Sequence, residues 1–196
     1  VWNGTSETIP VKACTAEEYQ DTPDVVLVCV KGYSLDSVVA FIQRVAGPET
    51  VVLPILNIYG TGGKMQEMLP DVDVLDGCTY LYAEIQKPGT ILQSGPYCRI
   101  VFGPRDHNLD DLRYQQIKRD FDASGIVGEL TAHIQRDALQ KFSYVSPVAP
   151  PAFITTPSLP ICRRTAKRAT ASSPWSARSA RLPTPWAARL TTMLCR

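Results

Sequence analysis

The sequence has little of what would assign a function directly. It contains only two histidines, and its six cysteines include no CxxC pair and no metal-ligand spacing. No glycine-rich GxGxxG motif occurs, and the longest apolar runs fall well short of the roughly 18 residues that span a bilayer. No charged and apolar leader opens the chain. These absences predict a cytoplasmic protein with reduced thiols, no metal and no membrane contact.

Acidic residues are missing from the C-terminal part of the chain. All 19 Asp and Glu residues lie at or before Asp137, so that residues 1–141, with 12 basic residues, carry a net charge of −7. Residues 142–196 have eight basic residues and no acid, a net charge of +8. A basic arm of this kind can bind nucleic acid. No nucleic-acid partner is expected here, because aromatic residues are few and no recognition motif accompanies the charge.

The first 140 residues alternate between strand and helix patterns. The stretch Asp24–Val30 is almost continuously apolar, which is typical of a strand buried on both faces. Apolar residues at helical spacing follow in Ser34–Val45, with Ser34 as the N-cap. The same criteria predict further strands at 10–14, 50–56, 72–84, 90–103 and 126–130, and helices at 64–69, 108–121 and 131–145. This alternation predicts an α/β fold with right-handed crossovers.

Three predicted strands end in residues that suit a ligand site. Lys31 and Asn57 follow the strands at 24–30 and 50–56, and Ala83 follows the run CTYLY within the stretch at 72–84. Ligands of open α/β sheets bind at the carboxyl ends of the strands. An ammonium group can meet a phosphate or carboxylate there, and a carboxamide can fix an amide or hydroxyl group. Taken singly, Lys31 also fits a solvated strand terminus, and Asn57 fits a turn.

Two further lysines, Lys64 and Lys141, stand at positions that could belong to a ligand site. The stretch Gly60–Lys64 departs from a phosphate-binding loop at both ends, because Ile58 stands for the first glycine and Met65 for the Ser or Thr. Lys141 stands beside the apolar face of the helix predicted at 131–145. Its stem could cover apolar surface while its head reaches water, or it could donate a proton within a partly dry cleft.

Five segments in sequence order resemble the ketopantoate reductase family. The segments together cover about residues 10–150, and they read DVVLVCVKGYSLDSVV, GPETVVLPILNIYG, LDGCTYLYAEIQKPGTILQSG, RIVFG and DALQKFSYVSP. Members bind NADPH on a Rossmann domain and reduce 2-dehydropantoate, in pantothenate and coenzyme A biosynthesis. The resemblance implies that Lys31, Asn57 and Ala83 contact the cofactor or line its cleft. It implies that Lys141 is the catalytic lysine, which protonates the keto oxygen.

The resemblance also implies a domain organisation. Residues 1–128 would form an incomplete Rossmann-type domain that lacks the glycine-rich first βαβ unit. Residues 129–150 would begin an all-α C-terminal domain. Residues 151–196 would be a basic tail, either disordered or read in a shifted frame. The expected partner is a small 2-keto acid, and a homodimer is allowed.

The chain departs from the family pattern at several positions. Ile58 follows Asn57 where the family has glycine, and Val145 and Ala149 replace asparagines that many members carry. A carboxylate that members supply from a later helix cannot be present after Asp137. We therefore expect impaired activity in this chain. The alternatives are a related 2-keto acid reductase, or a non-enzymatic protein that binds a partner through its basic tail.

Overall fold

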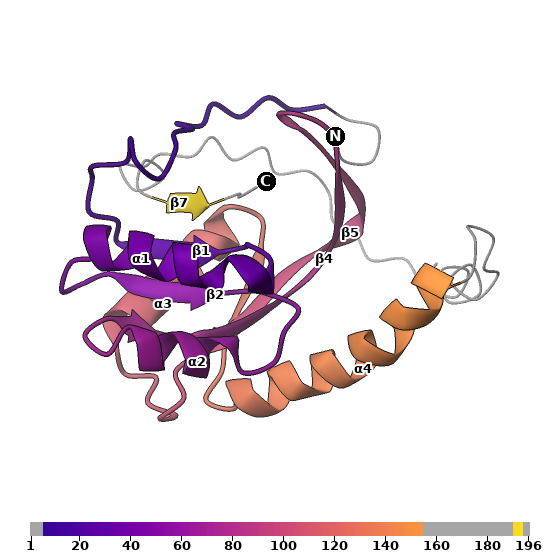
Figure 1. The fold of residues 1–196 in the computed structure, drawn as a ribbon. Coiled ribbons are helices and arrows are strands. Elements are labelled where there is room, and N and C mark those ends of the chain that lie inside the picture. Colours follow the sequence, from indigo (N-terminus) through magenta and orange to yellow (C-terminus); the bar gives the residue numbers. More distant parts are fainter. Residues whose placement is uncertain (1–5, 155–189, 194–196) are drawn as a thin grey trace.

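The computed structural model describes residues 6–154 and 190–193, which form two adjoining sheets with helices around them (Figure 1). The first sheet has the order β3-β2-β1-β7, and all its neighbouring strands are parallel. Its strands are β1 (Val25–Val28), β2 (Val51–Pro54), β3 (Asp73–Val74) and β7 (Leu190–Met193). The α/β fold class is thereby confirmed.

The second sheet has the order β4-β5-β6. It consists of β4 (Asp76–Lys87), β5 (Thr90–Gly103) and β6 (Val127–Leu130). β4 and β5 form a long antiparallel hairpin, and β6 runs parallel to β5. The helices are η1 (Gly32–Ser34), α1 (Leu35–Val45), α2 (Thr61–Met68), α3 (Leu112–Ala123) and α4 (Ile134–Ile154). None of the helices among the described residues is both long and apolar enough to cross a membrane.

The prediction that β1 is buried on both faces is confirmed. Val26 belongs to a cluster that includes Ile42 of α1, whereas Leu27 belongs to a second cluster with Phe102 and Phe121. The rings of these two phenylalanines meet edge to face at 5.6 Å. A strand between two apolar layers needs no polar alternation, which is why its sequence shows none.

Several predicted element boundaries differ from the structure. Residues 10–14, which the structure describes, form no strand. α3 begins at Leu112, because the carboxylate of Asp111 accepts a hydrogen bond from the backbone of Arg113 and so caps the helix. Asn108, the predicted cap, instead accepts a bond from the backbone of Asp110 in the preceding loop.

The C-terminal region also differs from expectation. α4 continues beyond Val145 to Ile154, and its ribbon curves along its length (Figure 1). Leu190–Met193 form β7, which pairs with β1, so the prediction of disorder is wrong for these four residues. Backbone pairing with an open sheet edge can order a short segment whose own sequence carries no strand pattern. Residues 155–189 and 194–196 lie outside the described residues, and the proposed domain boundaries stay predictions.

The β4–β5 hairpin changes character along its length. Its root is buried through Cys78, Val101 and Phe102, whereas residues 80–98, here called the arm, are mostly exposed. The arm turns at Pro88-Gly89, where Gly89 has a φ of 74° that suits glycine. The arm projects from the body of the fold (Figure 1).

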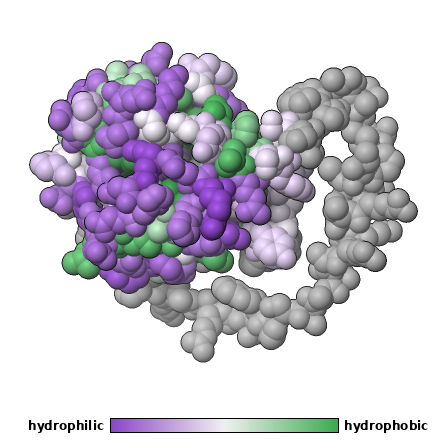
Figure 2. All heavy atoms as spheres, turned by 90° about the horizontal axis from the view of Figure 1, so that it is seen from below, coloured by the Kyte–Doolittle hydropathy of each residue, from purple (hydrophilic) through white to green (hydrophobic). Residues whose placement is uncertain are grey.

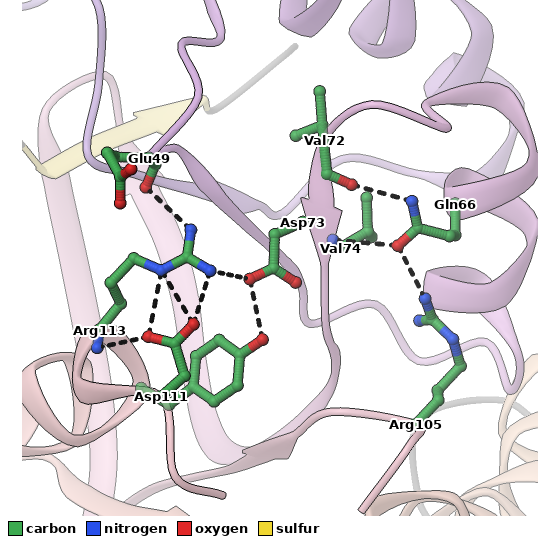
Figure 3. Close-up of polar contacts among 9 residues, drawn as sticks. Glu49, Gln66, Val72, Asp73, Val74, Arg105, Asp111 and Arg113 are labelled. Atoms are coloured by element: carbon green, nitrogen blue, oxygen red, sulfur yellow. Dashed lines mark hydrogen bonds and ion pairs between the residues drawn. The ribbon is translucent and has the colours of Figure 1, made fainter. Parts of the chain in front are cut away.

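A polar network joins α3 to the edge of the first sheet (Figure 3). Arg113 donates to the carboxylates of Asp73 at 2.9 Å and Asp111 at 2.6 Å. The hydroxyl of Tyr114 also donates to Asp73, at 2.8 Å. Burial and the bond to Asp73 raise the pKa of Tyr114, which therefore stays protonated.

Candidate functional site

Lys31 and Asn57 follow the carboxyl ends of two adjacent parallel strands, β1 and β2. Val28 of β1 is paired with Pro54 of β2, and each polar residue follows three positions later. Gly32 and Ile58 confirm that the two chain segments meet, because a Cβ on Gly32 would lie 2.6 Å from the Ile58 side chain. The expected convergence of these two strand ends is present.

Ala83 does not lie at a strand end, so its predicted position is wrong. β4 continues past it to Lys87, and Ala83 pairs with Gln93 within the exposed arm. The hairpin pairing with β5 extends the strand beyond the point where the pattern of polar residues suggested an end. A cofactor contact from Ala83 finds no support in this position.

Lys141 of α4 reaches back to the end of β2. Its Nζ donates a hydrogen bond to Oδ1 of Asn57 at 2.7 Å, across 84 positions of sequence. Lys141 is only 8% exposed, which is rare for a lysine. The fold therefore brings together two predicted site residues that lie far apart in the sequence.

The surroundings of Lys141 are largely apolar. A shallow cavity beside it is lined by Leu56, Ile58, Tyr59, Phe142 and Val145, among others. The rings of Tyr59 and Phe142 lie 6.4 Å apart. Burial lowers the pKa of Lys141, because a low-dielectric environment disfavours the ammonium form. Among the described side chains, no carboxylate lies within ion-pair distance of it.

A second cavity of about 210 Å³ adjoins the first one and is lined by Gly60–Gly63, Asp76 and Arg105. The carboxylate of Asp76 lies directly against Gly62 in the first turn of α2. Arg105 lies 3.6 Å from this carboxylate and donates to Gln66 at 3.0 Å (Figure 3). The cavity beside Gly60–Gly63 therefore already contains a carboxylate, which disfavours an anionic ligand there.

The position of Tyr80 was not predicted from the sequence. Its ring lies 5.6 Å from Nζ of Lys141, and it shares a face of β4 with Cys78. The strand alternation of the segment GCTYLY was the available signal, because residues two apart point to the same face. Within the described part of the chain, no group of His, Cys, Asp or Glu has the arrangement of a metal site.

Figure 2 shows the molecule from the side of α2 and α4. Hydrophilic residues cover most of the described surface in this view, and hydrophobic residues form separate patches.

The described cysteines, Cys14, Cys29, Cys78 and Cys98, are free thiols. Burial raises the pKa of Cys29 to about 11, which suits a core residue rather than a nucleophile.

Comparisons with known proteins agree with the resemblance. The chain is 26% identical over 143 residues to 2-dehydropantoate 2-reductase of Aquifex aeolicus, which covers 72% of the chain and 46% of the relative. It is 28% identical over 125 residues to the uncharacterized oxidoreductase YkpB of Bacillus subtilis, covering 63% and 40%. The crystal structure of 2-dehydropantoate 2-reductase from Porphyromonas gingivalis W83 superposes with a TM-score of 0.62 at 28% identity, covering 70% and 47%.

The chain thus spans less than half the length of these relatives. The family model described as "Ketopantoate reductase PanE/ApbA" matches residues 2–107, which is more than half of the chain. This match includes both strand ends of the site, Lys31 and Asn57. The chain belongs to the ketopantoate reductase PanE/ApbA family.

Proposed function

We propose that this protein reduces a 2-keto acid with a nicotinamide cofactor, and that 2-dehydropantoate is the first substrate to test. The observation that carries the proposal is the hydrogen bond between Lys141 and Asn57 at the edge of the parallel sheet. Because the partner of this buried lysine is a neutral carboxamide, the ammonium group is not held in an ion pair with a carboxylate. Its remaining N–H groups can therefore donate to a substrate. The catalytic role of Lys141 fits this arrangement.

Lys141 would act as the general acid. Its ammonium donates a hydrogen bond to the keto oxygen, which makes the carbonyl carbon more electrophilic, and transfers a proton to that oxygen as the carbon is reduced. The neutral amine that remains takes a proton from water. A lowered pKa brings the ammonium nearer to the working pH, where proton donation is more effective. Asn57 accepts one N–H of Lys141 and so directs the others.

The residues at the sheet edge suit a nicotinamide dinucleotide. Lys31 is exposed at this edge and can meet a phosphate, and the carboxamide of Asn57 can pair with a hydroxyl group or an amide. When bound, the reduced nicotinamide supplies the hydride. NADPH is proposed over NADH from the family resemblance. A homodimer and a cytoplasmic location remain predictions.

The proposal is tested with the full chain, NADPH and 2-dehydropantoate. We expect loss of NADPH absorbance together with pantoate detected by mass spectrometry. Lys141→Ala should abolish turnover, whereas Lys118→Ala, which removes an exposed lysine of α3, should leave it unchanged. Reduction that persists in Lys141→Ala would contradict the role of Lys141. Absence of both NADPH binding and reduction would contradict the proposed function.

A related 2-keto acid with an apolar side chain is the second candidate. Val145 lines the cavity beside Lys141, at a position where many family members carry asparagine. A valine cannot hydrogen-bond a substrate hydroxyl group, so an unhydroxylated substrate would lose nothing there. The comparison is 2-dehydropantoate against 3,3-dimethyl-2-oxobutanoate, which differs only by the hydroxyl group. A preference for the second that Val145→Asn reverses would favour this candidate.

A further inference from the structure

Two cations lie near the ring of Tyr80. Nζ of Lys141 lies 5.6 Å from the ring centroid, and the guanidinium carbon of Arg99 lies 5.1 Å from it. Both distances are within the range in which a cation is attracted by an aromatic face. Arg99 is also paired with Glu129 at 2.6 Å, so its charge is already compensated. Among the residues that the structure describes, no carboxylate pairs with Lys141 in this way.

The groups facing Lys141 are few. β4 contributes Cys78 and Tyr80, and the loop after β2 contributes the neutral carboxamide of Asn57. Asp137, one turn earlier on α4, instead accepts hydrogen bonds from Thr131 and Arg136. Burial of the Cys78 thiol raises its pKa, so the thiol stays neutral near pH 7. Tyr80 is therefore the one described aromatic group that can favour the ammonium form of Lys141.

The ring of Tyr80, rather than its hydroxyl group, faces the ammonium. The hydroxyl group of Tyr80 and the thiol of Cys78, two residues earlier on the same face of β4, influence each other's pKa. The face of the ring carries the negative side of the aromatic quadrupole. Partial desolvation strengthens this attraction, and Lys141 is 8% exposed while Tyr80 is 37% exposed.

We propose that Tyr80 is a positioning residue for Lys141: its ring face stabilises the ammonium form, and together with Asn57 it fixes the direction of Nζ. Asn57 binds one N–H, and the ring limits the rotation of the remaining two. The positioning of Lys141 by Tyr80 does not depend on the proposed function. Only the transfer of the Lys141 proton to a keto oxygen rests on it.

The test measures the pKa of Lys141 directly in the full chain, without cofactor or substrate. Competitive acetylation is followed across the alkaline pH range, and mass spectrometry quantifies the peptide that contains Lys141. Tyr80→Leu should lower this pKa by about half to one unit, because the ring is lost. Tyr80→Phe should leave the pKa close to that of the parent chain, since the ring is retained. Tyr97→Leu, at a 71% exposed position of the same hairpin, is the matched control and should change nothing.

A phenylalanine with a fluorinated ring at position 80 keeps the test independent of packing. Fluorination preserves the shape of the ring but removes the negative face, so it should lower the pKa of Lys141 as Tyr80→Leu does. An unchanged pKa in the fluorinated variant, or an equal fall in Tyr80→Phe, would overturn the proposal. Because the assay needs no turnover, such a result is distinct from a failure of the proposed reductase activity.

Discussion

The two ends of the β4–β5 hairpin show how differently one pair of strands can be stabilised. At the root, Cys78, Val101 and Phe102 are buried against neighbouring elements. In the arm, Tyr82, Ile85 and other large side chains are exposed although the backbone pairing continues. Strand pairing alone therefore does not determine whether side chains are buried. In the body of the fold, apolar side chains cover both faces of the sheet, whereas the faces of the arm are exposed. The predictions below test that difference.

The largest effect is expected for truncation in the doubly covered sheet. Leu53 of β2 is fully buried, and Leu53→Ala should lower the free energy of unfolding by about 2–5 kcal/mol, because it leaves a cavity. Ile85 of the arm is 68% exposed, and Ile85→Ala should change the value by less than about 0.5 kcal/mol. Denaturant unfolding followed by circular dichroism measures both. Equal losses would show that the arm is packed in solution.

Two adjacent glycines of α2 should give opposite results. A Cβ on Gly62 would collide with the Leu75 backbone and the Asp76 carboxylate, so Gly62→Ala should destabilise the fold by about 1–3 kcal/mol. A Cβ on Gly63 meets nothing within 4 Å, and Gly63→Ala should stabilise the helix by about 0.5–1 kcal/mol. The midpoints of thermal unfolding of the two variants decide this. A tolerated Gly62→Ala would mean that α2 lies further from β4 than described.

A smaller, pH-dependent effect is expected at the start of α3. Asp111 caps this helix and binds Arg113, and the hydrogen bond from Arg113 holds the pKa of the Asp111 carboxyl below its usual value of 3.8. Its contribution is therefore present above about pH 3.8 and is lost as the pH falls through the lower, folded-state pKa. At neutral pH, Asp111→Ala should cost about 1 kcal/mol.

Asp111→Asn is the control for this prediction. Asparagine retains a capping oxygen but has no titrating carboxyl group, so its difference from the parent chain should shrink as the pH is lowered. Urea unfolding at neutral and acidic pH measures this difference. A difference that is constant with pH would show that capping, rather than the charge pair with Arg113, accounts for the whole effect.

The smallest effect is expected at the base of the arm. Arg99 and Glu129 form an ion pair at 2.6 Å, but their side chains are 44% and 46% exposed. Glu129→Gln should therefore cost no more than about 1 kcal/mol. Any loss should diminish in high salt, where exposed charges are screened. A large loss that is insensitive to salt would mean that the pair is shielded from solvent, and that the arm is more ordered than its exposure indicates.

The spacing of apolar residues predicted those helices and strands whose structure depends on residues close by in the sequence. The apolar spacing of α1 and the unbroken apolar run of β1 both correspond to observed elements. The failures are long-range. β7 is defined by pairing with β1 across the whole chain, and the extension of β4 past Ala83 is defined by pairing with β5. Such contacts leave no period in the local sequence.

The candidate site was predictable to a similar extent. Parallel strands share an edge, so the proximity of Lys31 and Asn57 followed from two strand predictions. The position of Lys141 beside an apolar helix face allowed either a solvated lysine or a proton donor, and its assignment as the catalytic lysine came from the resemblance and stays a prediction. The position of α4 relative to the sheet cannot be read from its own apolar stripe. The ring contact of Tyr80 depends on this position as well, and so it required the structure.

The separation of Asn57 and Lys141 has a consequence for the order of folding. Contacts between distant residues carry a loop-closure cost that local helices and hairpins do not, and they tend to be established late. The bond across 84 positions closes only when α4 docks against β4 and β5 and so brings Lys141 to Asn57. Chains that have paired β1, β2 and β3 but have not yet docked α4 would lack this bond. Formation of the Lys141–Asn57 pair therefore coincides with the docking of α4.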